Sequence, residues 1–339
     1  MADDLKELLF RLCAARGTPG DETAAARAAA KELAPYGGAV KDALGNISAA
    51  FGPENAEGNI LLEAHLDQIG LVVTSVDGNG FLRVDKCGGA DPRVLPGSAV
   101  TVKGKKALSG IVCCTPPHLS DGKDDEVLPV GKSFVDIGLS KEKAEELVSP
   151  GDRITFSTKP VSLAGSRVSS AGLDNRAGAA ALVRCAQMLY KTGLKRRVTV
   201  LLSTREETGG QGASTGAFSA EPSEAICVDV GFACQPGVPP EKSHPLGGGP
   251  MVGFAPVLNR RISENLVKTA VKNNIPYKRD VMGGSTGTNS DNIAVVRSGV
   301  PTGMVSIPLR YMHTPAEVID LRDIENTALL IAEYIKGDF

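Results

Sequence analysis

The spacing of apolar positions predicts that the chain begins as an α/β protein. Residues 4–15 and 21–35 repeat apolar side chains at helical intervals, and the glycine- and proline-containing segment 17–20 separates them. Asp21 is positioned to cap the second helix. Residues 59–64 are mostly apolar, which predicts a buried strand.

A different pattern, of short strands and turns, occupies residues 70–158. The turn Asp-Gly-Asn-Gly at 77–80 predicts a hairpin between strands 71–76 and 81–84. A second hairpin and further elements are expected in the rest of the segment, namely strands at 99–102, 107–112, 130–137 and 154–157, and a charged helix near 140–148. This part is expected to form a small β-barrel or sandwich.

Helices and strands alternate again after residue 169. The expected order is an alanine-rich helix, two strands, a helix, a strand and a terminal helix, at 175–191, 197–203, 225–230, 262–273, 303–307 and 321–336. Such alternation is typical of sheets covered by helices. The sequence therefore predicts one α/β domain that a β-rich insertion interrupts after about residue 69.

Composition limits the function classes. At 339 residues the chain is longer than most single cores, so two domains are expected. A net charge of −2 gives no general attraction to nucleic acid or anionic membranes, and no apolar stretch reaches the roughly 18 residues that span a bilayer. The acidic N-terminus differs from a signal peptide, and seven cysteines without Cys-x-x-Cys spacing indicate buried, reduced thiols. We expect a cytoplasmic protein with no nucleic-acid or membrane partner; His118 and His244, both beside prolines, are expected in loops.

Two adjacent glutamates are the most informative feature of the sequence. Glu206 and Glu207 follow the apolar run 198–203 and precede the glycine-rich segment 208–212. This places both acids at the carboxyl edge of a sheet, where open α/β sheets bind their ligands. Because neighbouring residues of an extended chain point to opposite faces, we expect the two acids to have different roles.

Four further segments supply polar side chains at expected strand ends or helix starts. His65 and Asp67 follow the first buried strand, where the aspartate could hydrogen-bond the imidazole ring, although both could also be ordinary polar residues. Asp174 opens the alanine-rich helix and could instead be its N-cap. Asp229 interrupts an apolar strand, which is costly for a charge that is neither paired nor bound to a metal. His313 follows the last strand and could be a simple loop residue.

Together these residues form a set of candidate metal ligands. Two imidazoles and three carboxylates, without cysteine, are expected at one sheet edge: His65, Asp174, Glu207, Asp229 and His313. Such a set suits Zn²⁺, Co²⁺ or Mn²⁺, and it is large enough for two ions that share one carboxylate. Glu206 then remains as the general base.

The same segments resemble those of a known enzyme family. In chain order they are Ala64-His-Leu-Asp67, Gly88-Gly-Ala-Asp-Pro-Arg-Val94, Gly172-Leu-Asp-Asn-Arg176, Arg205-Glu-Glu-Thr-Gly209, Val228-Asp-Val230 and Ile307-Pro-Leu-Arg-Tyr-Met-His313. They resemble the glutamyl aminopeptidase/deblocking aminopeptidase family of dinuclear metallopeptidases over nearly the whole chain. Some members of that family carry a glucanase label.

The resemblance implies a fold, a reaction and an assembly. The implied fold is a mixed-sheet αβα metallopeptidase domain of residues 1–69 and 169–339, with a small β-barrel domain, 70–168, inserted for oligomerisation. The implied reaction removes N-terminal residues from short peptides with two divalent ions per subunit, of which zinc or cobalt is expected and manganese is an alternative. The implied assembly is a large homo-oligomer such as a dodecamer.

The resemblance also implies a role for each site residue. His65 and Asp229 would bind one ion, Glu207 and His313 would bind the other, and Asp174 would bridge the two. Asp67 would orient His65. Glu206 would take a proton from the attacking water and return it to the leaving amine.

Two positions depart from the family pattern. Gln68 stands where the family usually has glutamate, and Asn289 stands where the family motif Gly-Thr-Asp-Ala has aspartate. Neither residue is an expected ligand. We therefore expect catalysis to be kept, and specificity or the support of the site to differ.

Three alternatives stay open. A catalytically altered relative could act as a metal-binding assembly subunit. The glutamate pair could serve a glycan-active hydrolase, although adjacent acids do not straddle a glycosidic bond well. Residues 283–287 match Gly-x-Ser-x-Gly, with Asp291 and His313 in the order of a serine hydrolase triad.

Overall fold

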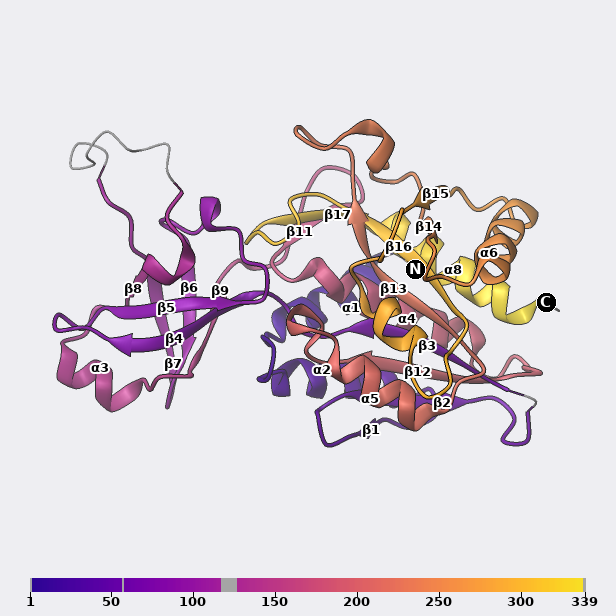
Figure 1. The fold of residues 1–339 in the computed structure, drawn as a ribbon, viewed down its shortest axis with the longest axis horizontal. Coiled ribbons are helices and arrows are strands. Elements are labelled where there is room, and N and C mark those ends of the chain that lie inside the picture. Colours follow the sequence, from indigo (N-terminus) through magenta and orange to yellow (C-terminus); the bar gives the residue numbers. More distant parts are fainter. Residues whose placement is uncertain (1, 57, 117–126, 338–339) are drawn as a thin grey trace.

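The computed structural model describes residues 2–56, 58–116 and 127–337. Figure 1 shows an α/β body with a smaller β-barrel beside it. His118, which was expected in a loop, lies outside the described residues. Among the described helices, none is long and apolar enough to cross a membrane.

An eight-stranded mixed sheet forms the centre of the α/β body, in the order β1-β2-β12-β3-β13-β16-β14-β15. The four central strands run parallel: β12 (Arg197–Ser203), β3 (Asn59–His65), β13 (Glu224–Phe232) and β16 (Thr302–Leu309). Antiparallel β2 (Ile47–Phe51) and β14 (Met251–Phe254) flank them, and β1 (Val40–Lys41) and β15 (Lys278–Val281) form the edges. The predicted mixed-sheet α/β architecture is confirmed.

Helices cover both faces of the sheet. On one face a large apolar core is shared by α1 (Ala2–Ala14), α2 (Thr23–Leu33), α4 (Leu173–Leu189), α6 (Arg260–Lys272) and α8 (Leu321–Lys336). The other face packs against α5 (Gln211–Ala220) and α7 (Asn289–Ala294). Strand β3 alternates between the two layers, since Ile60 and Leu62 join the first core and Leu61 joins the second. Burial on both faces explains why this strand is apolar almost throughout.

The barrel is closed and has its own apolar core. Its antiparallel strands, in order around the barrel, are β4 (Gly70–Val76), β5 (Leu82–Cys87), β8 (Phe134–Asp136), β7 (Ala107–Val112), β6 (Ala99–Lys103) and β9 (Arg153–Phe156). Helix α3 (Lys141–Leu147) follows β8, and both predicted hairpins are present. The insertion is therefore a barrel rather than a sandwich.

A small three-stranded sheet was not predicted from the sequence. It pairs β10 (Val161–Ser162), β11 (Arg167–Ser170) and β17 (Glu317–Asp320), so it joins the chain after the barrel to the segment before α8. Strands this short carry too few positions for a clear periodicity.

Several local expectations differ from the structure. Asp21 does not cap α2, whose N-cap is Glu22; Asp21 accepts a hydrogen bond from Lys103 of the barrel at 2.6 Å instead. The segment Val130–Lys132 is a 3-10 helix rather than part of a strand, and α5 begins at Gln211, inside the glycine-rich segment 208–212. All seven thiols are free, but Cys114 is exposed, and two others, Cys113 and Cys234, are half-buried.

Candidate active site

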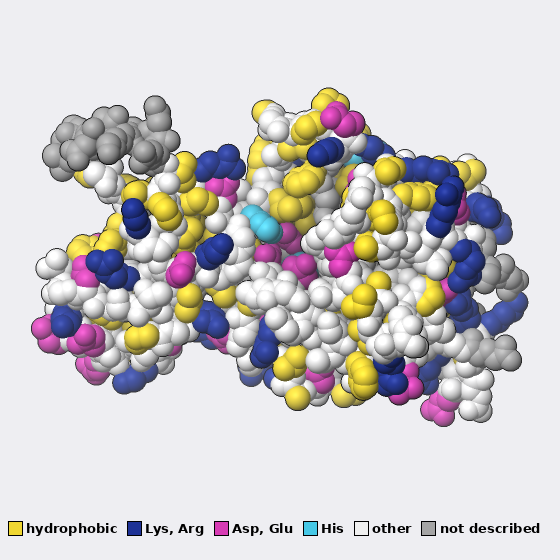
Figure 2. All heavy atoms as spheres, viewed as in Figure 1, with side chains coloured by type: hydrophobic (Ala, Val, Ile, Leu, Met, Phe, Trp, Pro, Cys, Tyr) yellow, Lys and Arg dark blue, Asp and Glu magenta, His cyan; other side chains and the backbone are white. Residues whose placement is uncertain are grey.

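Six of the seven predicted site residues line one cavity of about 710 Å³, and the seventh, Asp67, is fully buried and does not line it. His65 ends β3, Asp229 lies in β13 and His313 follows β16. Asp174 lies in the first turn of α4, and the two glutamates open a 3-10 helix, η4 (Glu206–Thr208), after β12. Figure 2 shows acidic side chains gathered in the hollow between the barrel and the α/β body.

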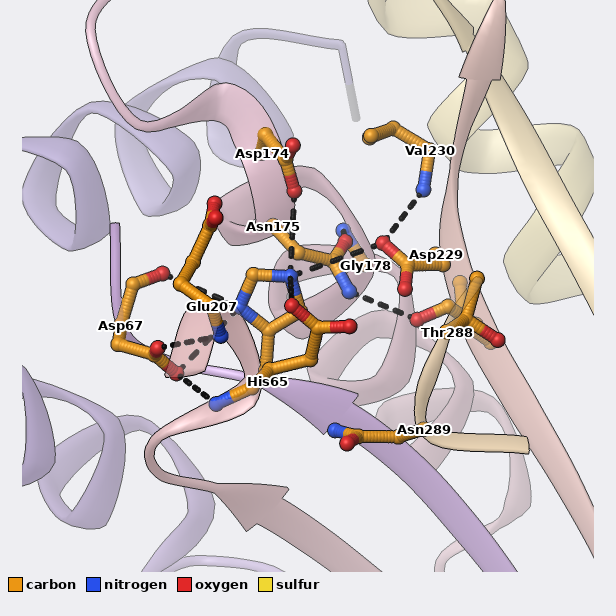
Figure 3. Close-up of polar contacts among 12 residues, drawn as sticks. His65, Asp67, Asp174, Asn175, Gly178, Glu207, Asp229, Val230, Thr288 and Asn289 are labelled. Atoms are coloured by element: carbon orange, nitrogen blue, oxygen red, sulfur yellow. Dashed lines mark hydrogen bonds and ion pairs between the residues drawn. The ribbon is translucent and has the colours of Figure 1, made fainter. Parts of the chain in front are cut away.

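The candidate ligand atoms fall into two groups that share one carboxylate. Atoms of His65, Asp174 and Asp229 lie within 4.8 Å of one another, and so do atoms of Asp174, Glu207 and His313. His65 Nε2 lies 3.1 Å from Asp174 Oδ1 (Figure 3). His313 Nε2 lies 3.4 Å from the other oxygen, Oδ2. These groups match the expected ones, and the ligand roles themselves stay predictions.

The two glutamates do not lie on an extended strand, so the premise that they point to opposite faces is wrong. Arg205 has a positive φ of 62°, and the chain turns into η4, which directs both acids into the same cavity. Their neighbours nevertheless differ. Glu206 Oε2 lies 3.8 Å from His65 Nε2, whereas Glu207 Oε1 lies 3.5 Å from His313 Nε2.

Two buried acids that belong to neither group accept hydrogen bonds from the backbone of the segments that carry the site residues. The carboxylate of Asp67 accepts hydrogen bonds from the N–H groups of Glu206 and Glu207, each at 3.0 Å (Figure 3). The carboxylate of Glu317 accepts from the N–H groups of Asp174 and His313, each at 3.1 Å. Glu317 was not predicted as a site residue. Its sequence signal is the same as that of Asp229, because it is an acid next to apolar residues, here Val318 and Ile319.

Asp67 contacts His65 mainly through its backbone. His65 Nδ1 lies 3.1 Å from the carbonyl oxygen of Asp67 and 3.5 Å from its carboxylate. The expected carboxylate contact is therefore the longer of the two. In the neutral imidazole that binds metals, an Nδ1–H that donates to the Asp67 carbonyl would leave Nε2, which faces Asp174, as the metal-binding atom.

Burial and the closeness of the carboxylates shift the pKa values of the side chains that line the cavity. Burial raises the pKa of Glu206 to about 9 and the pKa of Glu207 to about 8. Burial would lower the pKa of His65, but Glu206 and other carboxylates raise it well above its usual value. Burial opposes ionisation of Asp174, yet hydrogen bonds with the two imidazoles keep its pKa below its usual value. A divalent cation would relieve the same repulsion, so the donor set fits a hard or borderline metal ion.

The barrel insertion also reaches the cavity. A Cβ placed on Gly89 would lie 2.5 Å from His313 Nδ1, and one placed on Gly88 would lie 3.1 Å from Glu207 Oε2. The Asp91 N–H donates to the His313 carbonyl at 3.3 Å. The two glycines therefore allow the insertion to pack against His313 and Glu207, two candidate ligands of the second group.

The serine hydrolase alternative lacks its triad. Asp291 accepts hydrogen bonds from the backbone N–H groups of Thr286 and Gly287, at 3.0 and 3.1 Å, and so closes a local turn. The Nε2 atom of His313 faces Asp174 and Glu207 instead. The Gly-x-Ser-x-Gly match is therefore a structural turn.

Comparison with known proteins points to one family. A family model described as M42 glutamyl aminopeptidase matches residues 45–330. The chain is 33% identical over 299 residues to a lysyl aminopeptidase of Pyrococcus furiosus, covering 85% of this chain and 84% of that protein.

Solved structures agree with this match. An aminopeptidase from the archaeon Desulfurococcus kamchatkensis has a TM-score of 0.92 and 31% identity, covering 99% of this chain and 96% of that one. The TET1 peptidase of Pyrococcus horikoshii, described as able to assemble into a tetrahedron or a large octahedral shell, has a TM-score of 0.87 and 32% identity, with 98% and 100% coverage. A Thermotoga maritima structure described as an endoglucanase is also similar, with a TM-score of 0.77 and 27% identity over 97% of this chain and 96% of that one.

A substitution in the insertion tests its contact with the site. Gly89→Ala places a methyl group against the His313 ring, so the ring must move. We expect the affinity for Co²⁺ or Zn²⁺ at the group that contains His313, measured by calorimetry, to fall by about 10- to 100-fold. Gly78→Ala is the matched control, because a Cβ there meets open space. Equal metal affinity of both variants would contradict the positioning role of Gly89.

Proposed function

Because the chain belongs to the M42 glutamyl aminopeptidase family, we propose that it is a metal-dependent aminopeptidase that removes N-terminal residues from short peptides. The observation that carries this proposal is the pair of ligand groups that share Asp174 inside one cavity. An acid that belongs to neither group, Glu206, lines the same cavity.

We propose that the site takes two divalent ions, zinc or cobalt, with manganese as an alternative. His65, Asp174 and Asp229 would hold one ion, and Asp174, Glu207 and His313 would hold the other. When bound, the ions would lower the pKa of a water molecule and polarise the scissile carbonyl.

The chain itself would supply the proton transfers. Glu206 is held at its backbone by Asp67, and its carboxylate lies beside the first ligand group. We propose that a carboxylate oxygen of Glu206 takes the proton of the attacking water and then delivers it to the nitrogen of the leaving amine. Glu207, at the second group, would act as a ligand rather than as a base.

We further propose that the protein forms a homo-oligomer and that the barrel contributes to its interface. The TET1 relative is described as able to assemble into a tetrahedron or a large octahedral shell, and apolar side chains such as Ile111 are exposed on the barrel here. The domain boundaries at residues 70 and 168, and the role of this insertion in assembly, rest on that likeness.

The departures at Gln68 and Asn289 give little support to an inactive assembly subunit. Both side chains are buried, and neither lines the cavity. The ligand groups and Glu206 are complete without them. The glycan-active alternative is supported here only by the endoglucanase descriptions of two similar structures.

Glu206→Gln separates catalysis from metal binding. The amide cannot accept the proton of water, so we expect hydrolysis of aminoacyl substrates to fall by about 10²- to 10⁴-fold while metal content by elemental analysis is unchanged. Glu54→Gln, at an exposed loop position, is the control and should keep full activity. A Glu206→Gln variant that stays active would remove Glu206 from the role of base.

Removal of metal distinguishes the competing activities. We expect a chelator to abolish hydrolysis of leucyl, lysyl and glutamyl p-nitroanilides, and added Co²⁺ or Zn²⁺ to restore it. Bound metal with no turnover of any aminoacyl substrate would favour an assembly subunit. Release of sugar from a β-glucan in the presence of chelator would favour a glycan-active hydrolase.

The mass of the particle tests the assembly. The chain has a mass of 35.2 kDa, and light scattering should give a larger multiple of this value that does not depend on dilution. Deletion of the barrel would disturb the site as well, so Ile111→Glu, on the barrel surface, is the sharper variant and should reduce the particle mass. A monomer in solution would contradict the proposal.

A further inference from the structure

One wall of the cavity carries an acid that the proposed chemistry does not use. Asp280 lies in the edge strand β15 and lines the same cavity as His65 and Asp229. Its side chain is half-buried, and within the described part of the chain its carboxylate makes no hydrogen bond or ion pair. A partly desolvated carboxylate without a partner is unfavourable, so a cationic ligand would stabilise it.

The basic residues nearest to Asp280 along its strand are already engaged. Lys278 Nζ donates to the carbonyls of Glu241 and Ser243, at 3.1 and 2.6 Å. Arg279 Nη2 donates to Glu264 at 3.2 Å. Burial raises the pKa of Asp280, and Lys278 only partly opposes this rise. Lys242 also lines the cavity, but it is exposed on a short 3-10 helix.

Strand register shows how Asp280 lies relative to the ligand groups. Asp229 pairs with Ser306, Ser306 with Met251, and Met251 with Lys278. Asp280 is two residues beyond Lys278 and therefore shares its face of the sheet. Three strand spacings of about 4.8 Å each separate β13 from β15. A substrate bound at the ligand groups therefore needs a long side chain to reach Asp280.

The space between them suits the stem of such a side chain. Gly253, the partner of Asp280 in β14, has no side chain of its own, and Met304 and Met282 lie over it, where a Cβ would meet them at 3.1 and 3.4 Å. Met282 and Met304 line the cavity and supply an apolar wall. The same wall carries the hydroxyl of Ser306, which is fully buried and has no hydrogen-bond partner among the described residues.

Resting on the proposed aminopeptidase function, we propose that Asp280 determines specificity by binding the charged end of a basic N-terminal residue, lysine or arginine. The methylene stem of that residue would lie against Met282 and Met304, because long basic side chains combine an apolar stem with a charged end. An acidic N-terminal residue would meet the carboxylate of Asp280 as a like charge and be rejected.

Norleucine and lysine provide matched substrates, since their stems are alike and only lysine carries the ammonium. With metal-loaded full-length protein, we expect wild type to favour the lysyl over the norleucyl p-nitroanilide. In Asp280→Asn, kcat/KM for the lysyl substrate should fall by about 10- to 100-fold, while the norleucyl substrate is unaffected. Asp280→Glu should restore part of the preference, and Asp4→Asn, an exposed Asp-to-Asn change on α1, should leave the ratio unchanged.

The outcomes separate this inference from the function on which it rests. An unchanged lysyl-to-norleucyl ratio in Asp280→Asn overturns the specificity role while the aminopeptidase function stands. An equal fall for both substrates also overturns it, because Asp280 would then act on the shared α-amine or on the fold. If wild type hydrolyses neither substrate but does hydrolyse the glutamyl or leucyl p-nitroanilide, the specificity role fails and the aminopeptidase function stands. If wild type hydrolyses no aminoacyl substrate, the aminopeptidase function itself fails.

Discussion

Four acidic side chains crowd one cavity, and the surrounding structure is arranged to hold them there against their mutual repulsion. Asp174, Glu206, Glu207 and Asp229 line the same space, where like charges repel strongly because little water screens them. Contacts among these acids cannot hold them in place. Their positions are set instead from the backbone, where donors are available. Asp67 and Glu317 each accept hydrogen bonds from two N–H groups of the segments that carry the candidate ligands.

This arrangement explains why the sheet and its loops are built as they are. Central strands buried on both faces end at the cavity, so a residue such as His65 is fixed by the whole α/β body. The turn at η4 follows the neighbouring strand and is held from behind by Glu22, which accepts a hydrogen bond from the Arg205 N–H at 3.1 Å. The loop that carries His313 has in addition the barrel against it, through Gly89. A site that is formed between two bodies in this way depends on the contact between them.

Much of the site could be predicted from the sequence because its residues follow long apolar strands. His65, Asp229 and His313 each interrupt or follow a run whose burial is plain, and parallel strands bring such residues to one edge. What could not be predicted depends on tertiary register. Glu317 lies in a four-residue strand, and Asp280 lies in another, so neither has a periodicity that reveals its neighbours. The sequence does not reveal the direction of the two glutamates, because the extended chain ends before Glu206, at Arg205, whose φ is positive.

Asn289, which departs from the family pattern, has a buried hydrogen-bond partner that requires its amide. Its Nδ2 donates to Glu63 Oε1 at 2.8 Å, and the hydroxyl of Ser203 donates to the same oxygen at 2.6 Å. Glu63 is buried in β3, and burial raises its pKa to about 7. An aspartate at position 289 would place a second acceptor against this carboxylate, whereas the amide supplies the donor that a buried acid requires. Because Glu63 lies two residues before His65 on the same face of β3, the amide supports the strand that carries the first imidazole. The substitution is thus explained by its buried partner and needs no loss of catalysis to account for it.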